Sequence, residues 1–186
     1  SIKKDDFDTF QKLLSKSNLS INSEIQESVI QNSFRYPHEI PLIDFAIYHG
    51  SINIFKFLLM QNADLDSNSL IYSSIRSENY EIIHIIEKEL SKKFEKLALF
   101  NSISCWNQEL IDYMIDNYNY NFLLEKCEVI DKSQIMELLY YTFYSTNFIF
   151  FESTLLPFLR NNKDFVEKNI YDIISYLIVI HNSVIF

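Results

Sequence analysis

A helix-turn-helix pattern that recurs every 28 residues is the feature that most constrains the fold of this chain. Leu42, Leu70 and Ala98 begin three successive copies, and the apolar residues behind them keep the same spacing, as Ile83 and Ile111 do. Two short helices cannot bury their apolar faces alone, so each pair needs copies of itself on either side. The pattern therefore predicts a stack of helix pairs.

The central copy is the best formed. Its apolar spacing predicts one helix over residues 42–48 and a second over residues 52–61. The turn between them contains Gly50, the only glycine of the chain. Ala46 is a small residue in the middle of the first helix, where a neighbouring helix can approach closely. We expect Asn62 to end the second helix in the left-handed conformation that glycine usually takes.

A looser copy precedes the central one. Residues 8–16 match its second helix at an offset of 45 residues. The additional residues of this first copy include a capping signal that starts at Ser20, which predicts a short helix over residues 24–31. Pro37 closes this helix, because the residue before a proline avoids the α region.

A further pair follows the three central copies. Residues 133–144 and 147–160 have the apolar spacing of helices and come after a longer connection. Pro157 lies inside the second of these helices, so we expect it to kink or shorten that helix.

Features at the two ends of the chain predict that more protein, of this chain or of a partner, adjoins them. Residues 173–186 overlay residues 42–55, which predicts a turn at His181 and Asn182. Terminal repeats normally have a polar outer face, whereas this end is strongly apolar. The chain also begins at Ser1 rather than at a methionine. We therefore expect either that the natural protein continues or that a partner covers the apolar end.

The composition favours an all-α fold. Apolar residues make up 48% and aromatic residues 16% of the 186 residues, which is enough for a core. With 1 glycine and 3 prolines, the chain lacks the turn residues that a sandwich of β-hairpins needs. The prediction is a single helical solenoid domain over residues 1–186, with about five repeats. Their approximate bounds are 1–40, 41–68, 69–96, 97–132 and 133–166, with a partial repeat at 167–186.

The central copy resembles the second half of an ankyrin repeat. The small residue, the His-Gly turn, the leucine pair and the Asn-Ala-Asp end follow that family's order without a gap. These residues are Ala46, His49, Gly50, Leu58, Leu59, Asn62, Ala63 and Asp64. The combination of copies over roughly residues 1–130 resembles, more narrowly, a divergent ankyrin-like family of unknown function that is abundant in trichomonad parasites.

Departures from the ankyrin pattern modify what the resemblance implies. Residues 41–44 read Pro-Leu-Ile-Asp where the family has Thr-Pro-Leu-His, and Glu78 and Trp106 stand in the place of the turn glycine. The spacing of 28 residues is shorter than the ankyrin period of about 33. The resemblance therefore implies an ankyrin-like solenoid whose β-hairpin fingers are short or missing, with its first helices along a concave binding face.

Charge and cysteine content limit the partners and the compartment. The formal net charge is −9, from 25 acidic and 16 basic residues, which argues against a nucleic-acid binder. No apolar run reaches the roughly 20 residues of a membrane span. Cys105 and Cys127 form neither a disulfide framework nor a metal motif, so we expect a cytoplasmic, reducing setting.

The sequence contains no recognisable catalytic, cofactor-binding or metal-binding residues. One glycine cannot build a phosphate-binding loop, and the four histidines show no metal-ligand spacing. Cys105 has no neighbouring base that would lower the pKa of its thiol. We therefore expect that the protein is not an enzyme and that it uses no cofactor.

The remaining candidate is a binding surface. The resemblance places variable positions of the first helices on the concave face. These candidate partner-binding residues are Phe45, Tyr48, His49, Ser73, Arg76, Ser77, Asn101, Ser104 and Trp106. Trp, Tyr and Arg are enriched at binding hot spots, so Trp106 is the strongest single candidate. The alternative for Phe45 and Tyr48 is simple packing on a neighbouring helix or loop.

The resulting hypothesis is a protein–protein interaction or scaffold module that presents a rigid concave helix face to a partner protein. Stacked helices lose little conformational entropy when they bind. A structural subunit of a larger assembly is the alternative, and an enzyme with an unrecognised site is a weaker one. The sequence does not indicate the identity of the partner.

Overall fold

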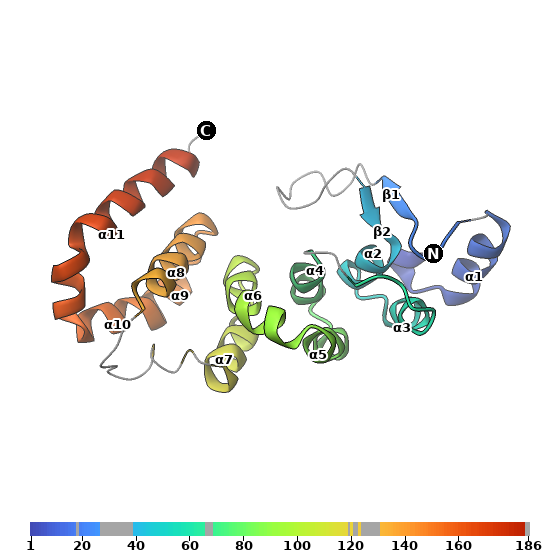
Figure 1. Ribbon diagram of the computed structural model, residues 1–186, viewed down its shortest axis with the longest axis horizontal. Coiled ribbons are helices and arrows are strands. Elements are labelled where there is room, and N and C mark those ends of the chain that lie inside the picture. Colours follow the sequence, from blue (N-terminus) through green and yellow to red (C-terminus); the bar gives the residue numbers. More distant parts are fainter. Residues whose placement is uncertain are drawn as a thin grey trace. The chain divides into compact units, whose positions relative to one another are not determined.

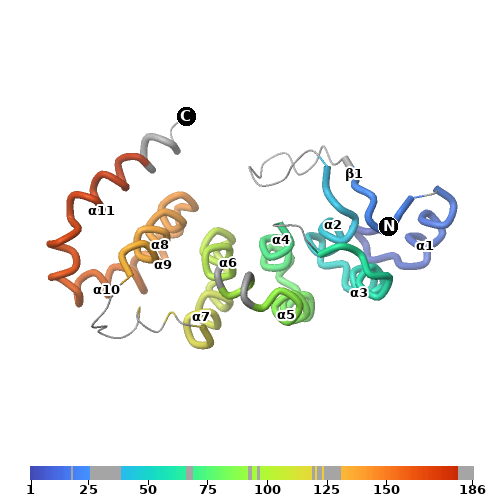
Figure 2. Tube along the Cα trace, viewed as in Figure 1, coloured from blue at the N-terminus to red at the C-terminus, as the bar shows by residue number. Residues whose placement is uncertain are grey.

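The computed structural model is mostly helical, which confirms the predicted all-α class (Figure 1). It describes the backbone of residues 1–17, 19–26, 39–65, 69–118, 120, 123 and 131–184, and Figure 2 draws every residue of uncertain placement in grey. The chain divides into two compact units, Ser1–Phe94 and Glu95–Phe186.

The N-terminal unit contains two complete helix pairs and an incomplete one. Its elements are η1 (Ile2–Lys4), α1 (Phe7–Lys16), β1 (Glu24–Gln26), β2 (Glu39–Pro41), α2 (Leu42–Tyr48), α3 (Ile52–Met60), α4 (Leu70–Arg76) and α5 (Tyr80–Glu89). Helix α2 packs against α3, α4 packs against α5, and the two pairs meet through α2 and α4. Ala46 is fully buried in α2, as its small size predicts for a close helix contact.

The short helix predicted over residues 24–31 is wrong where the structure describes it. Glu24–Gln26 forms strand β1, which pairs antiparallel with β2 so that Ile25 lies opposite Ile40. Pairing with residues that are distant in the sequence overrides the local capping signal, and Ile40 is buried by it. The rest of the predicted helix lies outside the described residues.

One type of turn joins the helices of every pair in both units. Gly50, Glu78, Trp106 and Thr146 have φ angles of 66°, 54°, 60° and 56°, and Asp5 before α1 has 50°. All five therefore adopt the left-handed conformation, although glycine is the only residue that takes it without strain. The predicted left-handed end of α3 is also confirmed, because Asn62 has a φ of 58°.

Backbone hydrogen bonds explain how these turns hold. The amide of Gly50 donates to Ile47 O over 2.9 Å, and the amide of Ser51 donates to Ala46 O over 2.9 Å. The same two bonds recur around Thr146, at 3.1 and 2.9 Å. This is the Schellman arrangement, which satisfies the last carbonyls of a helix. The repeated pattern is thus present in the backbone even where the glycine is absent.

The C-terminal unit contains longer helices. Its elements are α6 (Ser91–Ser104), whose first turn belongs to the N-terminal unit, α7 (Gln108–Asn117), α8 (Lys132–Tyr144), α9 (Phe148–Phe150), the π-helical η3 (Phe151–Leu155), α10 (Leu156–Asn161) and α11 (Lys163–Val184). Pro157 lies in the first turn of α10, directly after the π-helical segment. The helix is not shortened at Pro157, because it continues to Asn161. The π-helical segment before it fits a proline, which has no amide hydrogen and crowds the preceding turn.

The turn predicted at His181 and Asn182 is wrong. Helix α11 continues through both residues and ends at Val184. A His-Asn pair without glycine is a weak stop signal, and the apolar residues before it support a continuing helix. Helix α11 packs along α8 through Ile173 and neighbouring residues of the same face.

Candidate functional site

The candidates of the central copy form a small aromatic cluster in the N-terminal unit. Phe45 is 4% exposed, and its ring centroid lies 4.4 Å from that of His49. The ring of Tyr48 also contacts His49, with ring centroids 5.2 Å apart. Lys3 Nζ lies 5.7 Å from the centre of the Phe45 ring and covers it. Phe45 therefore packs within the unit, whereas Tyr48 and His49 remain half-exposed.

The candidates of the next copy divide between the interior and the surface. Ser73 is buried, and its hydroxyl donates to the buried carboxylate of Asp44 on α2. Ser69 donates to the second oxygen of the same carboxylate, so Asp44 joins α2 to α4. Ser77 donates to Ser74 O over 2.6 Å within its own turn, and only Arg76 is well exposed. Ser73 thus has a packing role.

The third copy contains one exposed candidate. Asn101 is 6% exposed, and Ser104 donates its hydroxyl hydrogen to Phe100 O over 2.9 Å. Trp106 is 49% exposed, and its indole Nε1 donates to Ser145 O over 3.0 Å. Its ring therefore lies against the turn between α8 and α9, where it is both accessible and held in place.

A set of aromatic residues that the sequence reasoning missed lies one repeat further on. Tyr141 and Tyr144 precede the left-handed Thr146 by five and two residues, as Phe45 and Tyr48 precede Gly50. Alignment on the turn, rather than on the 28-residue spacing, would have found them. They are the fourth-copy equivalents of the predicted binding positions.

These tyrosines belong to a continuous aromatic surface of the C-terminal unit, which we call the tyrosine face. Tyr141 stacks on Phe100 of α6 at 4.8 Å, and Tyr140 stacks on Tyr144 at 5.4 Å, each with an interplanar angle of 15°. Tyr140 also contacts Tyr176 of α11 at 6.3 Å. Tyr144 is 40% exposed, and Tyr140, Tyr141 and Tyr176 are half-buried. Rings from three helices thus form one surface.

Two acidic residues of the same unit lie near the buried phenol of Tyr120. The hydroxyl of Tyr120 donates to Glu95 O over 3.4 Å. Burial raises the pKa of Tyr120, and the negative charges of Glu137 and Glu95 raise it further. Both carboxylates therefore lie within electrostatic reach of one phenol. Lys132 Nζ contacts Asp172 at 2.5 Å, so this described lysine is already paired.

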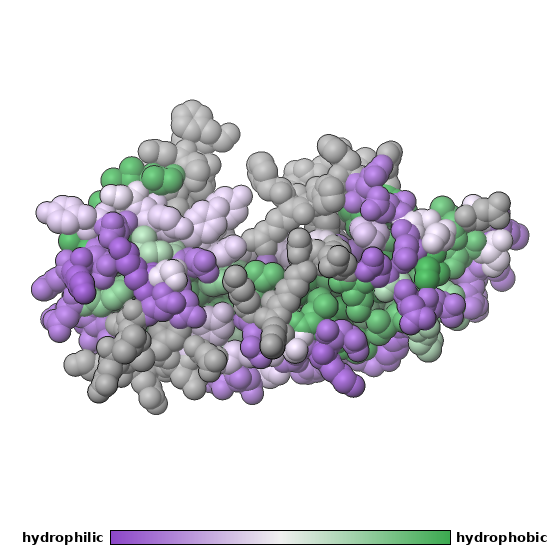
Figure 3. All heavy atoms as spheres, viewed as in Figure 1, coloured by the Kyte–Doolittle hydropathy of each residue, from purple (hydrophilic) through white to green (hydrophobic). Residues whose placement is uncertain are grey.

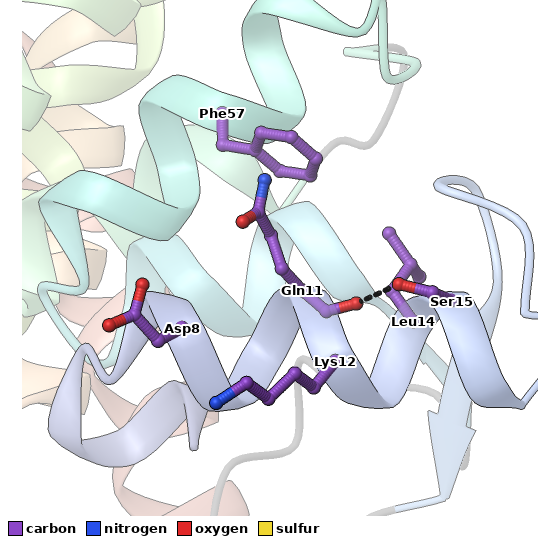
Figure 4. A pocket seen from close by; sticks show the side chains of 6 residues that line it. All are labelled: Asp8, Gln11, Lys12, Leu14, Ser15 and Phe57. Carbon is purple, nitrogen blue, oxygen red and sulfur yellow. Dashed lines mark hydrogen bonds between the residues drawn. The ribbon is translucent and has the colours of Figure 1, made fainter.

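A groove with a volume of about 470 Å³ lies between α1 and α3 in the N-terminal unit (Figure 4). Phe57 extends from α3 toward the side chain of Gln11 on α1, as Figure 4 shows. The other lining residues are Asp8, Lys12, Leu14 and Ser15. All of its polar side chains are exposed to water. The groove therefore offers a contact surface and lacks the buried, convergent polar groups that catalysis requires.

An apolar stripe lies on the side of α11 that faces away from α8. Tyr171, Ile174 and Ile178 follow one another at helical spacing and are 85%, 48% and 55% exposed. Figure 3 shows hydrophobic surface at upper left, in the region where Figure 1 draws α11. Helix α11 is thus apolar on two sides, and only one of them is packed within the unit.

The described part of the chain contains neither a cluster of metal ligands nor a membrane-spanning helix. No group of three or more His, Cys, Asp or Glu residues there could hold a metal ion. Within those same residues, no helix combines the length and the hydropathy that crossing a bilayer requires. Comparisons with protein-family models, with curated proteins and with solved structures give no match to this chain.

Proposed function

We propose that this chain is a protein-binding module, an ankyrin-like solenoid that presents the tyrosine face and the adjoining turns to a partner protein. The observation that carries the proposal is the tyrosine face itself. Four tyrosine rings lie together on helices, and the most accessible of them, Tyr144, is 40% exposed. Tyrosine supplies a large amphipathic contact area at a low entropic cost.

The turns support the solenoid part of the proposal. In the N-terminal unit, Asn79 Nδ2 donates to Gly50 O over 3.3 Å, which links the turns of consecutive pairs. In the C-terminal unit, Asn147 Nδ2 donates over 3.0 Å to Ile103 O, in the last turn of α6, and so links its own turn to the preceding pair. Such nearest-neighbour contacts are what a repeat protein depends on. They hold the first helices rigid, so that binding orders few additional groups.

The positions at which the tyrosines lie also support it. The resemblance to ankyrin repeats predicts partner contacts five and two residues before the turn. Those positions are held by Phe45 and Tyr48 in one pair and by Tyr141 and Tyr144 in another. The cysteine content favours a reducing, intracellular setting for such a module.

Photo-crosslinking tests this function. The full chain with p-benzoylphenylalanine in place of Tyr144 is irradiated in an extract of cells that express the protein. The same probe in place of Glu152, which is exposed on η3, serves as the control. We expect discrete adducts from position 144 that are absent from position 152. Equal patterns from the two positions would contradict a binding role for the tyrosine face.

A structural subunit of a larger assembly is the second candidate, and the apolar stripe of α11 favours it. Monomeric proteins rarely expose such a continuous row of large apolar side chains. The probe in place of Tyr171, which is 85% exposed, tests this candidate. Adducts from position 171 that include a second subunit, together with none from position 144, would favour assembly over partner recognition.

A further inference from the structure

The chemistry of the tyrosine face indicates what kind of partner segment it binds. Tyr144 presents an exposed ring that stacks on Tyr140, and Tyr140 makes a tilted contact with Tyr176. The face of an aromatic ring carries partial negative charge and attracts cations. Because Tyr144 and Tyr140 are stacked with an interplanar angle of 15°, a planar cation can lie parallel to both rings.

Carboxylates beside the rings make the same surface anionic. Glu137 lies three and four residues before Tyr140 and Tyr141, so helical geometry places it on their side of α8. It is exposed, as is Glu95. Both lie near Tyr120, whose hydroxyl bonds to the backbone of Glu95. Lys132, five residues before Glu137 on α8, already contacts Asp172.

We infer that the tyrosine face binds a segment of a partner protein that carries arginine or lysine side chains. One cation of the segment lies over the exposed ring of Tyr144, and a second basic side chain, about two helical turns away along α8, pairs with the carboxylate of Glu137. Arginine fits both positions better than lysine, since its planar guanidinium can stack on a ring or form two bonds to a carboxylate. This inference rests on the proposed protein-binding function and specifies the partner.

Other classes of partner segment match this surface less well than a basic one. An acidic segment or a nucleic acid would meet Glu95 and Glu137 with like charge. A purely apolar segment would leave both carboxylates partly desolvated and without a partner, which lowers affinity. A basic segment satisfies the rings and the carboxylates together.

Peptide selection on the immobilised full chain tests the inference. A random dodecapeptide library is panned, and the affinities of the selected peptides are measured by fluorescence anisotropy. The variants are Tyr144→Ala and Glu137→Gln, with Tyr171→Ala and Glu152→Gln as matched controls on other surfaces of the same unit. Circular dichroism establishes that all four variants keep the helical content of the parent.

We expect selected peptides that are rich in arginine and that bind about tenfold more weakly to Tyr144→Ala and to Glu137→Gln. Both control variants should retain the parent affinity, and added salt should weaken binding to the parent chain. Peptides that depend on Tyr144 but carry no basic residue would overturn the inference while leaving the protein-binding function intact. The inference would also be overturned if neither substitution changed the affinity of the selected peptides, or if the library yielded no binding peptide. In either case the photo-crosslinking at position 144 would test the protein-binding function separately.

Discussion

The asparagine that follows the turn at Thr146 gives the sharpest test of how the helix pairs are joined. Asn147 is 2% exposed, and its Oδ1 accepts a hydrogen bond from the amide of Phe150 over 3.1 Å. Its Nδ2 donates to Ile103 O over 3.0 Å. One side chain therefore caps α9 and also binds the end of α6. Asn147→Ala removes both interactions without adding bulk.

The expected cost follows from these two bonds. Loss of a helix N-cap costs about 1 kcal/mol, and loss of a bond to a buried carbonyl costs about another 1 kcal/mol. For a chain of this length, the total of about 2 kcal/mol lowers the melting temperature by roughly 4–8 °C. Asn147→Ser keeps a capping oxygen but cannot reach Ile103, so it should lose about half as much.

Thermal and urea unfolding, followed by circular dichroism, measure these losses. Asn117→Ala is the control, since Asn117 is exposed and bonds only to Tyr113 O within its own helix among the contacts described. It should change the free energy of unfolding by less than about 0.5 kcal/mol. The reasoning is refuted if Asn147→Ala costs no more than Asn117→Ala, or if Asn147→Ser is as costly as Asn147→Ala.

Further predictions concern the turns and a buried phenol. In Gly50→Ala the new Cβ would meet Ser77 O at 3.7 Å and Asn79 Cβ at 3.9 Å, so only backbone strain opposes it. The urea midpoint should reveal a loss of about 1 kcal/mol. Thr146→Gly removes a β-branched side chain from a backbone position with a φ of 56°. The free energy of unfolding in the same assay should therefore rise by about 0.5–1 kcal/mol. The raised pKa of Tyr120 means that its stabilising contribution is complete below its ordinary pKa of 10.0 and is lost as the pH rises through the folded value. Unfolding measured from pH 8 to about 12 should therefore be less pH-dependent in Tyr120→Phe.

Local sequence signals were sufficient for the helices of the central copies. The predicted helix over residues 42–48 has the same bounds as α2, and the second predicted helix extends one residue beyond α3. Apolar spacing and turn residues act within a few positions, so they can be read without the tertiary structure. The left-handed conformation of Asn62 belongs to the same class of local signal.

Predictions that depended on distant partners failed. Strand β1 exists because β2, some fifteen residues later, supplies its backbone partners. The capping signal near Ser20 contains no information about that pairing. At the other end, similarity to the His-Gly turn suggested a break in α11, but packing along α8 supports an unbroken helix.

The sequence indicated which positions before a turn belong to the candidate site, but it identified only some of the residues that occupy them. The positions before the turn were chosen on a fixed spacing of 28 residues, whereas the fourth turn comes 40 residues after Trp106. Tyr141 and Tyr144 were missed for that reason. Burial could not be read from the sequence either, and Phe45, Ser73 and Asn101 are buried.

The turns themselves explain why the repeat survives such sequence divergence. Of the five left-handed residues at equivalent turns, glycine occupies one, and a search for the His-Gly signature finds only that copy. The following position is Asp6, Ser51, Asn79, Asn107 or Asn147, all of which are residues that favour N-caps. Four of these residues cap the helix that follows them, and Ser51 is the exception. Helix α3 is capped instead by Asp5, whose carboxylate accepts hydrogen bonds from the amides of Asn53 and Ile54 at 3.1 Å each. The cap and the Schellman bonds together fix the turn, so the residue at positive φ is free to vary at a cost of about 1 kcal/mol. It follows that divergent copies of this unit are better found by a polar capping residue between two apolar helices than by a glycine.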